Sequence, residues 1–338
     1  MALLDVRDLH VSFPTDDGLV QAVRGVSFSV DPGKTLGIVG ESGSGKSVST
    51  QTIVGLTRGA QISGEAIFGG KDLLKMPRRE LEAIRGRDIA MIFQDPLTSL
   101  HPYYRIGWQI VELIRAHDKR VSKRAARDRA INLLRLVGIP QPETRVDDFP
   151  HQFSGGMRQR AMIAMAMSLN PALLVADEPT TALDVTVQAQ VLRVIKRLQE
   201  EFGTALIMIT HDLGVIAETA DDVVVMYAGT VMETGGRDRI FYEQHHPYTE
   251  GLLDSLPSYG DEHQRLRPIV GQPPSLINLP SGCKFHPRCP YVMPQCRTEE
   301  PPLDPVAGRS NHLSACWLSH APGERQAAYD RIRGEATA

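Results

Sequence analysis

The chain of 338 residues has no excess of basic side chains, no long apolar run and no cysteine before residue 283. Without a run of about 18 or more apolar residues, no segment can cross a bilayer as a helix. The formal net charge of -3 argues against a protein that binds nucleic acid through bulk positive charge. Asp5 and Asp8 stand where a secretory leader would be basic and then apolar, so we expect the chain to stay in the cytosol.

All the cysteines lie near the end of the chain, with the spacing C-x5-C-x6-C-x19-C. In a reducing compartment such a cluster holds a metal more often than it forms disulfides. The spacing lacks the C-x2-C pairs of common zinc ribbons, which shifts the prediction from zinc toward an iron-sulfur cluster. Zinc, and reduced thiols packed as small apolar groups, stay open as alternatives. The residues concerned are Cys283, Cys289, Cys296 and Cys316.

Strand and helix patterns divide the chain. Apolar and polar residues alternate over 3–13 and 20–30 around the turn sequence PTDDG, which predicts an antiparallel hairpin. Helical periodicity dominates from about 96 to 168, and strands alternate with helices from about 172 to 235. We therefore expect an α/β fold, with a mostly parallel sheet, flanking helices, an antiparallel β subdomain and a helical insert.

The composition of the chain changes after about residue 235, where proline becomes frequent. Of the 23 prolines, 13 lie in the last 102 residues, so regular elements there should be short. We expect one domain over 1–235 and a Pro- and Cys-rich C-terminal extension over 236–338, in which a metal site would act as a staple.

The segment GESGSGKS, Gly40 to Ser47, fits the phosphate-loop pattern and stands between a predicted strand and a predicted helix. Its backbone N–H groups and the helix N-terminus suit phosphate oxygens. Lys46 is predicted to reach the β- and γ-phosphates and Ser47 to ligate Mg²⁺. A glycine-rich turn with a surface lysine is the weaker alternative. The predicted nucleotide contacts are Gly40, Ser42, Gly43, Ser44, Gly45, Lys46, Ser47 and Val48.

The segment LLVADEPT, Leu173 to Thr180, is an apolar strand that ends in two acids. Asp177 is predicted to hold the metal's water shell, and Glu178 to orient and deprotonate an attacking water. Acids that merely begin a helix are the alternative. The segment FSGGMRQR, Phe153 to Arg160, opens a helix with a serine cap, and its N–H groups and hydroxyl also suit a second phosphate-binding surface.

Over residues 3 to 235 the chain resembles the nucleotide-binding subunit of ABC transporters. The resemblance rests on an ordered set: GESGSGKS, Gln94 in MIFQDP, FSGGMRQR, LLVADEPT, TALD at Thr181 to Asp184, and ITHD around His211. The variants FQDPLTSLHP and ADEPTTALDVTVQAQ, with the cysteine-bearing tail, resemble the D-type ATPase of bacterial dipeptide and oligopeptide importers. This implies a P-loop NTPase fold of ABC type over 1–235 and a peptide-transporter-type extension over 236–338.

The resemblance further implies an ATPase that works as a head-to-tail pair with two ATP molecules between the subunits. The second subunit is expected to be a paralogue, and the pair is expected to sit on two permease subunits served by an extracytoplasmic binding protein. That places the chain at the cytoplasmic face of the cell membrane, as a peripheral protein without a nucleic-acid partner. Family members carry a [4Fe-4S] cluster in this C-terminal region, which the four cysteines would bind.

Residues are assigned by this resemblance at their positions in the present chain. Ser154, Gly155 and Gly156 would meet the γ-phosphate bound to the partner subunit, and Asp184 would line the interface between subunits. Met157 replaces the glutamine that usually closes this segment, and we expect the site to work without that contact.

Gln94 would touch Mg²⁺ and report to the membrane subunit, while His211 would contact the γ-phosphate and help to hold the attacking water. Phe13 is expected to stack on adenine, with an edge-of-sheet core aromatic as its alternative. His101 stands where relatives carry asparagine, and a solvated loop histidine is its preferred interpretation.

Three other functions stay open. The first is an importer ATPase for a nickel chelate, glutathione, an antimicrobial peptide or a sugar oligomer. The second is an ABC-type ATPase that acts on nucleic acid or the ribosome. The third is a non-hydrolysing scaffold, against which the intact Glu178 and His211 argue.

Overall fold

The computed structural model describes residues 2–95, 99–181, 183–255, 268–306, 308–320 and Gly323. Contacts divide the chain into two compact units. The first comprises 1–4, 29–35 and 67–209, and the second comprises 5–28, 36–66 and 210–338. The domain boundary near residue 235 stays a prediction. In the described part of the chain, no helix is long and apolar enough to cross a membrane.

Three parallel strands form the core of the first unit. The middle strand, β7 (Leu173–Asp177), is buried at every residue and pairs with β6 (Ile89–Ile92) on one side and β8 (Ala205–Ile209) on the other. Because all three are parallel, their carboxyl ends meet at one edge, where ligands bind in open α/β sheets. A short strand, β5 (Lys71–Asp72), pairs with residues 67–68.

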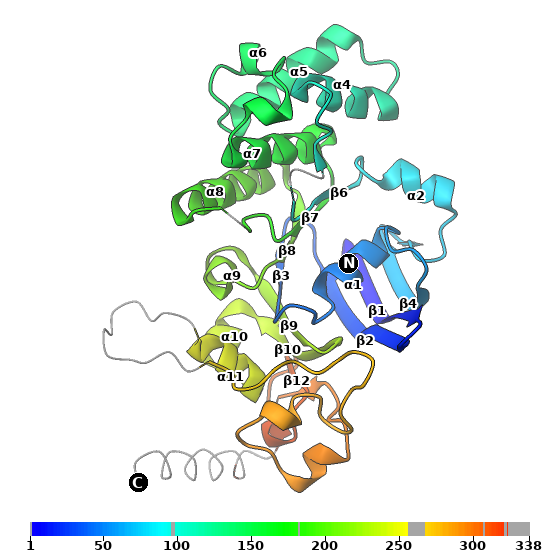
Figure 1. Cartoon of the computed structure of the whole chain (residues 1–338), viewed down its shortest axis with the longest axis vertical. Coiled ribbons are helices and arrows are strands. Elements are labelled where there is room, and N and C mark those ends of the chain that lie inside the picture. The colour runs from blue at the N-terminus through cyan, green and yellow to red at the C-terminus, as the bar shows by residue number, and fades with distance from the viewer. Residues whose placement is uncertain are drawn as a thin grey trace. The chain divides into compact units, whose positions relative to one another are not determined.

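Helices fill the interval between β6 and β7, which confirms the predicted helical insert apart from residues 96–98, which lie outside the described residues (Figure 1). Side-chain caps explain where several of them begin: Ser122 accepts a hydrogen bond from the Ala125 N–H, for example. The helices of this unit are α2 (Arg78–Ile84), α4 (Ile106–His117), α5 (Lys123–Leu136), α6 (Pro142–Arg145), η1 (Pro150–Gln152), α7 (Gly155–Ala166), η2 (Met167–Leu169) and α8 (Val185–Phe202).

The second unit contains the predicted hairpin, β1 (Leu4–Thr15) and β2 (Gly18–Val30), with β4 (Gln61–Phe68) hydrogen-bonded to β1 (Figure 1). It also contains a parallel pair, β3 (Thr35–Val39) and β9 (Asp222–Tyr227), and β9 turns back into β10. The remaining elements of the core of this unit are α1 (Lys46–Ile53), α9 (Leu213–Thr219) and β10 (Thr230–Gly236).

The C-terminal extension adds strands to the sheet of this unit, which the proline-rich sequence did not indicate. β12 pairs antiparallel with β10, with Ser314 opposite Glu233, and β11 pairs with β12. The extension also contains one helix that begins at Pro247, α11. The elements are α10 (Arg237–Tyr242), α11 (Pro247–Asp254), η3 (His286–Arg288), η4 (Pro294–Arg297), β11 (Asp304–Pro305), β12 (His312–Ser314) and η5 (Trp317–His320).

Candidate functional site

The phosphate loop connects β3 to α1 and lies against the backbone of two other strands. A Cβ at Gly40 would lie 2.1 Å from the Met226 carbonyl oxygen, and a Cβ at Gly45 would lie 2.3 Å from that of Ala22. Both glycines also have positive φ angles, 147° and 97°, which side chains rarely allow. The loop therefore keeps its curl because glycine permits both the contact and the conformation.

Lys46 begins α1 and is folded into this loop. Its side chain is almost fully buried, and Nζ donates to the carbonyl oxygens of Gly40 at 2.7 Å and Glu41 at 2.9 Å. Ser44 and Gly45 are buried, Ser42 and Gly43 form the exposed tip, and Ser47 and Val48 are partly exposed in the first turn of α1. The ammonium group thus sits on the concave side of a loop whose remaining N–H groups suit an anion.

The acids of the first unit lie at the carboxyl edge of its strands. Asp177 is buried at the end of β7, and Glu178 follows with a φ of 47°, a conformation that non-glycine residues seldom adopt. The N–H of Glu178 donates to the Ile209 carbonyl at 2.8 Å, which holds this conformation in place. Strained residues of this kind cluster at functional sites.

The Glu178 carboxylate accepts hydrogen bonds from two side chains. Gln94 Nε2 lies 3.0 Å and Thr181 Oγ1 2.8 Å from Glu178 Oε2. Gln94 reaches Glu178 because β6 and β7 are parallel neighbours and both residues follow the ends of their strands. The sequence analysis included Thr181 in the TALD motif but assigned no role to its side chain. Its position three residues after Glu178 was the signal that could have indicated this contact.

The segment FSGGMRQR begins α7 as predicted, with Ser154 as the N-cap. Ser154 Oγ accepts from the Met157 N–H at 3.3 Å, and both Ser154 and Gly155 are exposed. A Cβ at Gly156 would lie 2.6 Å from Val187 Cγ1, so packing against α8 explains that glycine. A Cβ at Gly155 would come no closer than 4.0 Å to another atom, so nothing within this unit requires that glycine.

Gln159, one further residue of α7, was missed by the sequence. It is buried, and its Nε2 donates to the Pro179 carbonyl at 2.5 Å, which ties the helix to the loop after Glu178. Arg158 and Arg160 flank it in the sequence, so the local pattern gave no signal that this amide is buried and needs a partner.

The other predicted residues have these positions. Asp184 is exposed and caps α8, accepting from the Val187 N–H at 3.0 Å. In the second unit, His211 is exposed one residue before Asp212, the N-cap of α9, and Phe13 is partly buried on β1. The structure brings Gln94 and Glu178 into contact in the first unit. That unit also contains Ser154 and Asp184, whereas the phosphate loop belongs to the second unit, as do Phe13 and His211.

The four cysteines are all free and line one small cavity of about 10 Å³, together with His246 and Phe285. Burial raises the pKa of the Cys283 thiol to about 12 and raises the pKa values of Cys289 and Cys316. Among the described residues, no three His, Cys, Asp or Glu side chains stand where they could hold a metal ion. The donor set suits a thiophilic group, and the cavity between the thiols has room for about one water.

Two family models match the chain. Residues 23–181 match "ABC transporter", and residues 232–296 match "Oligopeptide/dipeptide transporter, C-terminal region". The chain is 54% identical to the oligopeptide transport ATP-binding protein OppD of Bacillus subtilis (strain 168) over 94% of this chain and 89% of that protein. It is 48% identical to the dipeptide transport ATP-binding protein DppD of the same organism over 99% and 98%.

A solved structure of an ATP-binding cassette, described as the dimer of a post-hydrolysis state with ADP and Pi, is also similar. Its TM-score is 0.63 at 25% identity, and the match covers 69% of this chain and 98% of that one.

Proposed function

The chain belongs to the ABC transporter family, among its oligopeptide and dipeptide transport ATP-binding proteins, and we propose that it hydrolyses ATP to energise peptide import. Identity of about half over nearly the whole length, including the extension, carries this conclusion. An importer for a nickel chelate, glutathione or a sugar oligomer has no observation in its favour.

The residues divide the work of hydrolysis as follows. Lys46 and the N–H groups of the phosphate loop neutralise phosphate charge, and His211 contacts the γ-phosphate. Glu178 takes the proton of the attacking water, and the hydrogen bonds from Gln94 and Thr181 hold its carboxylate in one orientation. Ser47 and Gln94 would supply oxygen ligands for Mg²⁺, a donor type that this ion prefers, and Asp177 would hold its water shell. Phe13 stacks on the adenine ring.

The working form is a dimer of ATPase subunits. The exposed Ser154 and Gly155 at the N-terminus of α7 support this, because spare N-terminal N–H groups suit an anion and nothing within their own unit uses the space at Gly155. With Gly156 and the exposed Asp184, they face the nucleotide bound to the other subunit. We propose a paralogous partner, so that the assembly is a heterodimer.

Two membrane permease subunits complete the assembly, with an extracytoplasmic substrate-binding protein as an indirect partner. An exposed aromatic cluster on the first unit supports a docking role, because Tyr and Trp are enriched at interfaces. The ring centroids of Tyr104 and Trp108 lie 4.2 Å apart in a stacked arrangement, and those of His101 and Tyr104 lie 4.6 Å apart. The neighbouring Tyr103 is 82% exposed. The chain would then sit at the cytoplasmic face of the cell membrane without entering the bilayer.

We also propose that the four thiols bind a [4Fe-4S] cluster. Their convergence on one cavity and the absence of disulfides between them support this, since four thiolates ligate such clusters. The cluster would act as a staple for the extension, because peptide import involves no redox step. Iron, acid-labile sulfide and zinc content of anaerobically purified protein, with Cys289→Ser for comparison, decides between cluster, zinc and free thiols.

The decisive test of the catalytic assignment is Glu178→Gln in the assembled complex. Turnover should fall by at least about 10²-fold, because the general base is lost, while ATP affinity is retained. Phosphate release and equilibrium binding of ATP measure the two quantities. Glu201→Gln, on the exposed side of α8, is the matched control and should leave both unchanged. Unchanged turnover in Glu178→Gln would refute the role of Glu178.

A further inference from the structure

One arginine of the extension forms an ion pair with the phosphate loop. The Arg288 guanidinium forms two parallel hydrogen bonds with the Glu41 carboxylate, of 2.6 Å from Nη1 and 3.0 Å from Nη2. Glu41 is the second residue of the phosphate loop, 247 positions earlier in the chain, and Arg288 is only 5% exposed. Paired bonds of this kind between charged groups are among the strongest and most directional that proteins make.

Other groups hold Arg288 in this position. Its Nε donates to the Val270 carbonyl at 3.1 Å, and its Nη1 also donates to the Tyr227 hydroxyl at 3.2 Å. Tyr227 packs against Phe285, three residues before Arg288, with ring centroids 5.4 Å apart. The arginine is therefore held by Val270 of the extension and by Tyr227 of β9.

Glu41 is held at its backbone as well. Its N–H donates to the Tyr248 hydroxyl of α11 at 2.9 Å, and its carbonyl accepts from Lys46 Nζ at 2.9 Å. The extension thus reaches one residue of the loop through both Tyr248 and Arg288, and that residue holds the catalytic lysine.

A carboxylate beside a triphosphate site repels the ligand unless a positive charge compensates it. We propose that Arg288 neutralises the charge of Glu41 beside the phosphate loop, so that ATP affinity depends on this residue of the C-terminal extension. This inference rests on the proposed function, because it requires ATP to bind at the loop.

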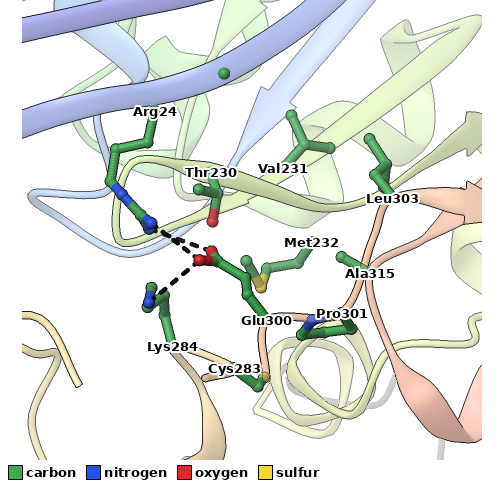
Figure 2. Close-up of a pocket in the computed structure, with 11 residues that line it drawn as sticks. Arg24, Thr230, Val231, Met232, Cys283, Lys284, Glu300, Pro301, Leu303 and Ala315 are labelled. Atoms are coloured by element: carbon green, nitrogen blue, oxygen red, sulfur yellow. Dashed lines mark hydrogen bonds and ion pairs between the residues drawn. The ribbon is translucent and has the colours of Figure 1, made fainter. Parts of the chain in front are cut away.

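A second ion-pair cluster joins the extension to the same unit and serves as a matched control. Glu300 accepts from Arg24 at 3.1 Å and pairs with Lys284 at 3.2 Å, beside a cavity of about 200 Å³ (Figure 2). It resembles the Arg288 contact in charge, although Glu300 is more exposed than Glu41, and it does not touch the phosphate loop. Breaking this cluster therefore tests whether a weaker attachment of the extension changes ATP affinity when the contact to the phosphate loop is left intact.

The experiment compares single and double variants of the full chain by equilibrium binding of ATP. Arg288→Gln should weaken ATP binding roughly tenfold, because one charged hydrogen-bond pair is lost and the Glu41 charge is exposed. Glu41→Gln should leave the affinity unchanged or tighten it, since the positive charge of Arg288 then acts on the phosphates. The double variant should return to within about threefold of the wild type.

Each outcome separates this inference from simpler readings. Glu300→Gln should lower the midpoint of thermal unfolding without changing ATP affinity. If Arg288→Gln and Glu41→Gln weaken binding equally, or if the double variant binds as poorly as Arg288→Gln, the ion pair is merely structural and the inference fails. Should Arg288→Gln not fold, Glu41→Gln alone decides, since a weakened affinity there contradicts the inference. If the wild type binds no ATP, the proposed function itself fails.

Discussion

The phosphate loop and the Ser154 segment are both glycine-rich and both precede a helix, but their surroundings differ. Around the phosphate loop, carbonyl oxygens of Ala22 and Met226 stand where side chains at Gly45 and Gly40 would be, and Lys46 is buried. Around Ser154 and Gly155 the surface is exposed and the space is open. The groups around the phosphate loop come from its own chain, whereas the open space at Ser154 and Gly155 agrees with the proposal that a second chain completes that site.

This difference explains what each glycine is for. At Gly45 the backbone conformation and the close approach of another strand both exclude a side chain, so the requirement is internal. At Gly155 neither applies, which agrees with the proposal that this glycine faces nucleotide held by the partner subunit. Substitution of Gly45 should therefore affect ATP binding by the isolated subunit, whereas substitution of Gly155 should affect only ATP turnover by the assembled complex.

Gly45→Ala should give the largest effect. Its Cβ would lie 2.3 Å from a backbone oxygen, so the loop must shift, and we expect ATP binding to fall by at least about 100-fold, or roughly 3 kcal/mol. Gly155→Ala should bind ATP like the wild type in the isolated subunit and lose turnover in the assembled complex. Equal loss of ATP binding in both variants would break the comparison.

Acid should lower the free energy of unfolding because of His246. This buried histidine caps α11, accepting from the Tyr248 N–H at 3.0 Å, and burial lowers its pKa to about 4. The unfolded chain binds the proton near pH 6.5, so between about pH 6.5 and 4 the unfolded state gains protons that the folded state does not. The free energy of unfolding should therefore fall with decreasing pH, by up to about 1.4 kcal/mol per unit.

Denaturant unfolding at pH 7, 6 and 5 measures this effect, with His246→Asn as the comparison, because asparagine can also cap a helix but does not titrate. The variant should show a shallower loss of stability than the wild type. Identical slopes would mean that other groups cause the acid sensitivity.

Ser154→Ala should give the smallest effect on stability, about 1 kcal/mol, because one N-cap hydrogen bond is lost at an exposed helix end. ATP affinity of the isolated subunit should not change. A loss of turnover in the assembled complex that exceeds the loss of stability would identify the hydroxyl as a contact to nucleotide held by the partner. Thermal unfolding and phosphate release provide the two readings.

The sequence predicted the parts of this molecule that local pattern determines. Gly40 to Ser47 lies between a strand and a helix as expected, Ser154 caps α7, and the strands that precede Gln94 and Glu178 are parallel, in agreement with the predicted parallel sheet. These features depend on turn chemistry, period and strand direction, all of which are readable within a few tens of residues.

Long-range pairings were beyond that reach. No pattern near Arg288 indicates Glu41, because a salt bridge between distant segments leaves no periodic signal. The pairing of β12 with β10 was hidden because β12 has only three residues and follows a proline-rich stretch. The amide of Gln159 needed the position of Pro179, which only the packed structure provides.

The confinement of every thiol to one cavity makes the rest of the molecule open to site-directed labelling. Burial raises the pKa of Cys283 to about 12 and also raises the pKa values of Cys289 and Cys316, so these thiols should react slowly with labels, because thiolate is the reactive form. A single cysteine placed at Val185, which is 83% exposed at the start of α8, would therefore react selectively with a spin label or fluorophore. Distances between such labels on two subunits would then follow their approach and separation through the ATP cycle in the otherwise native chain.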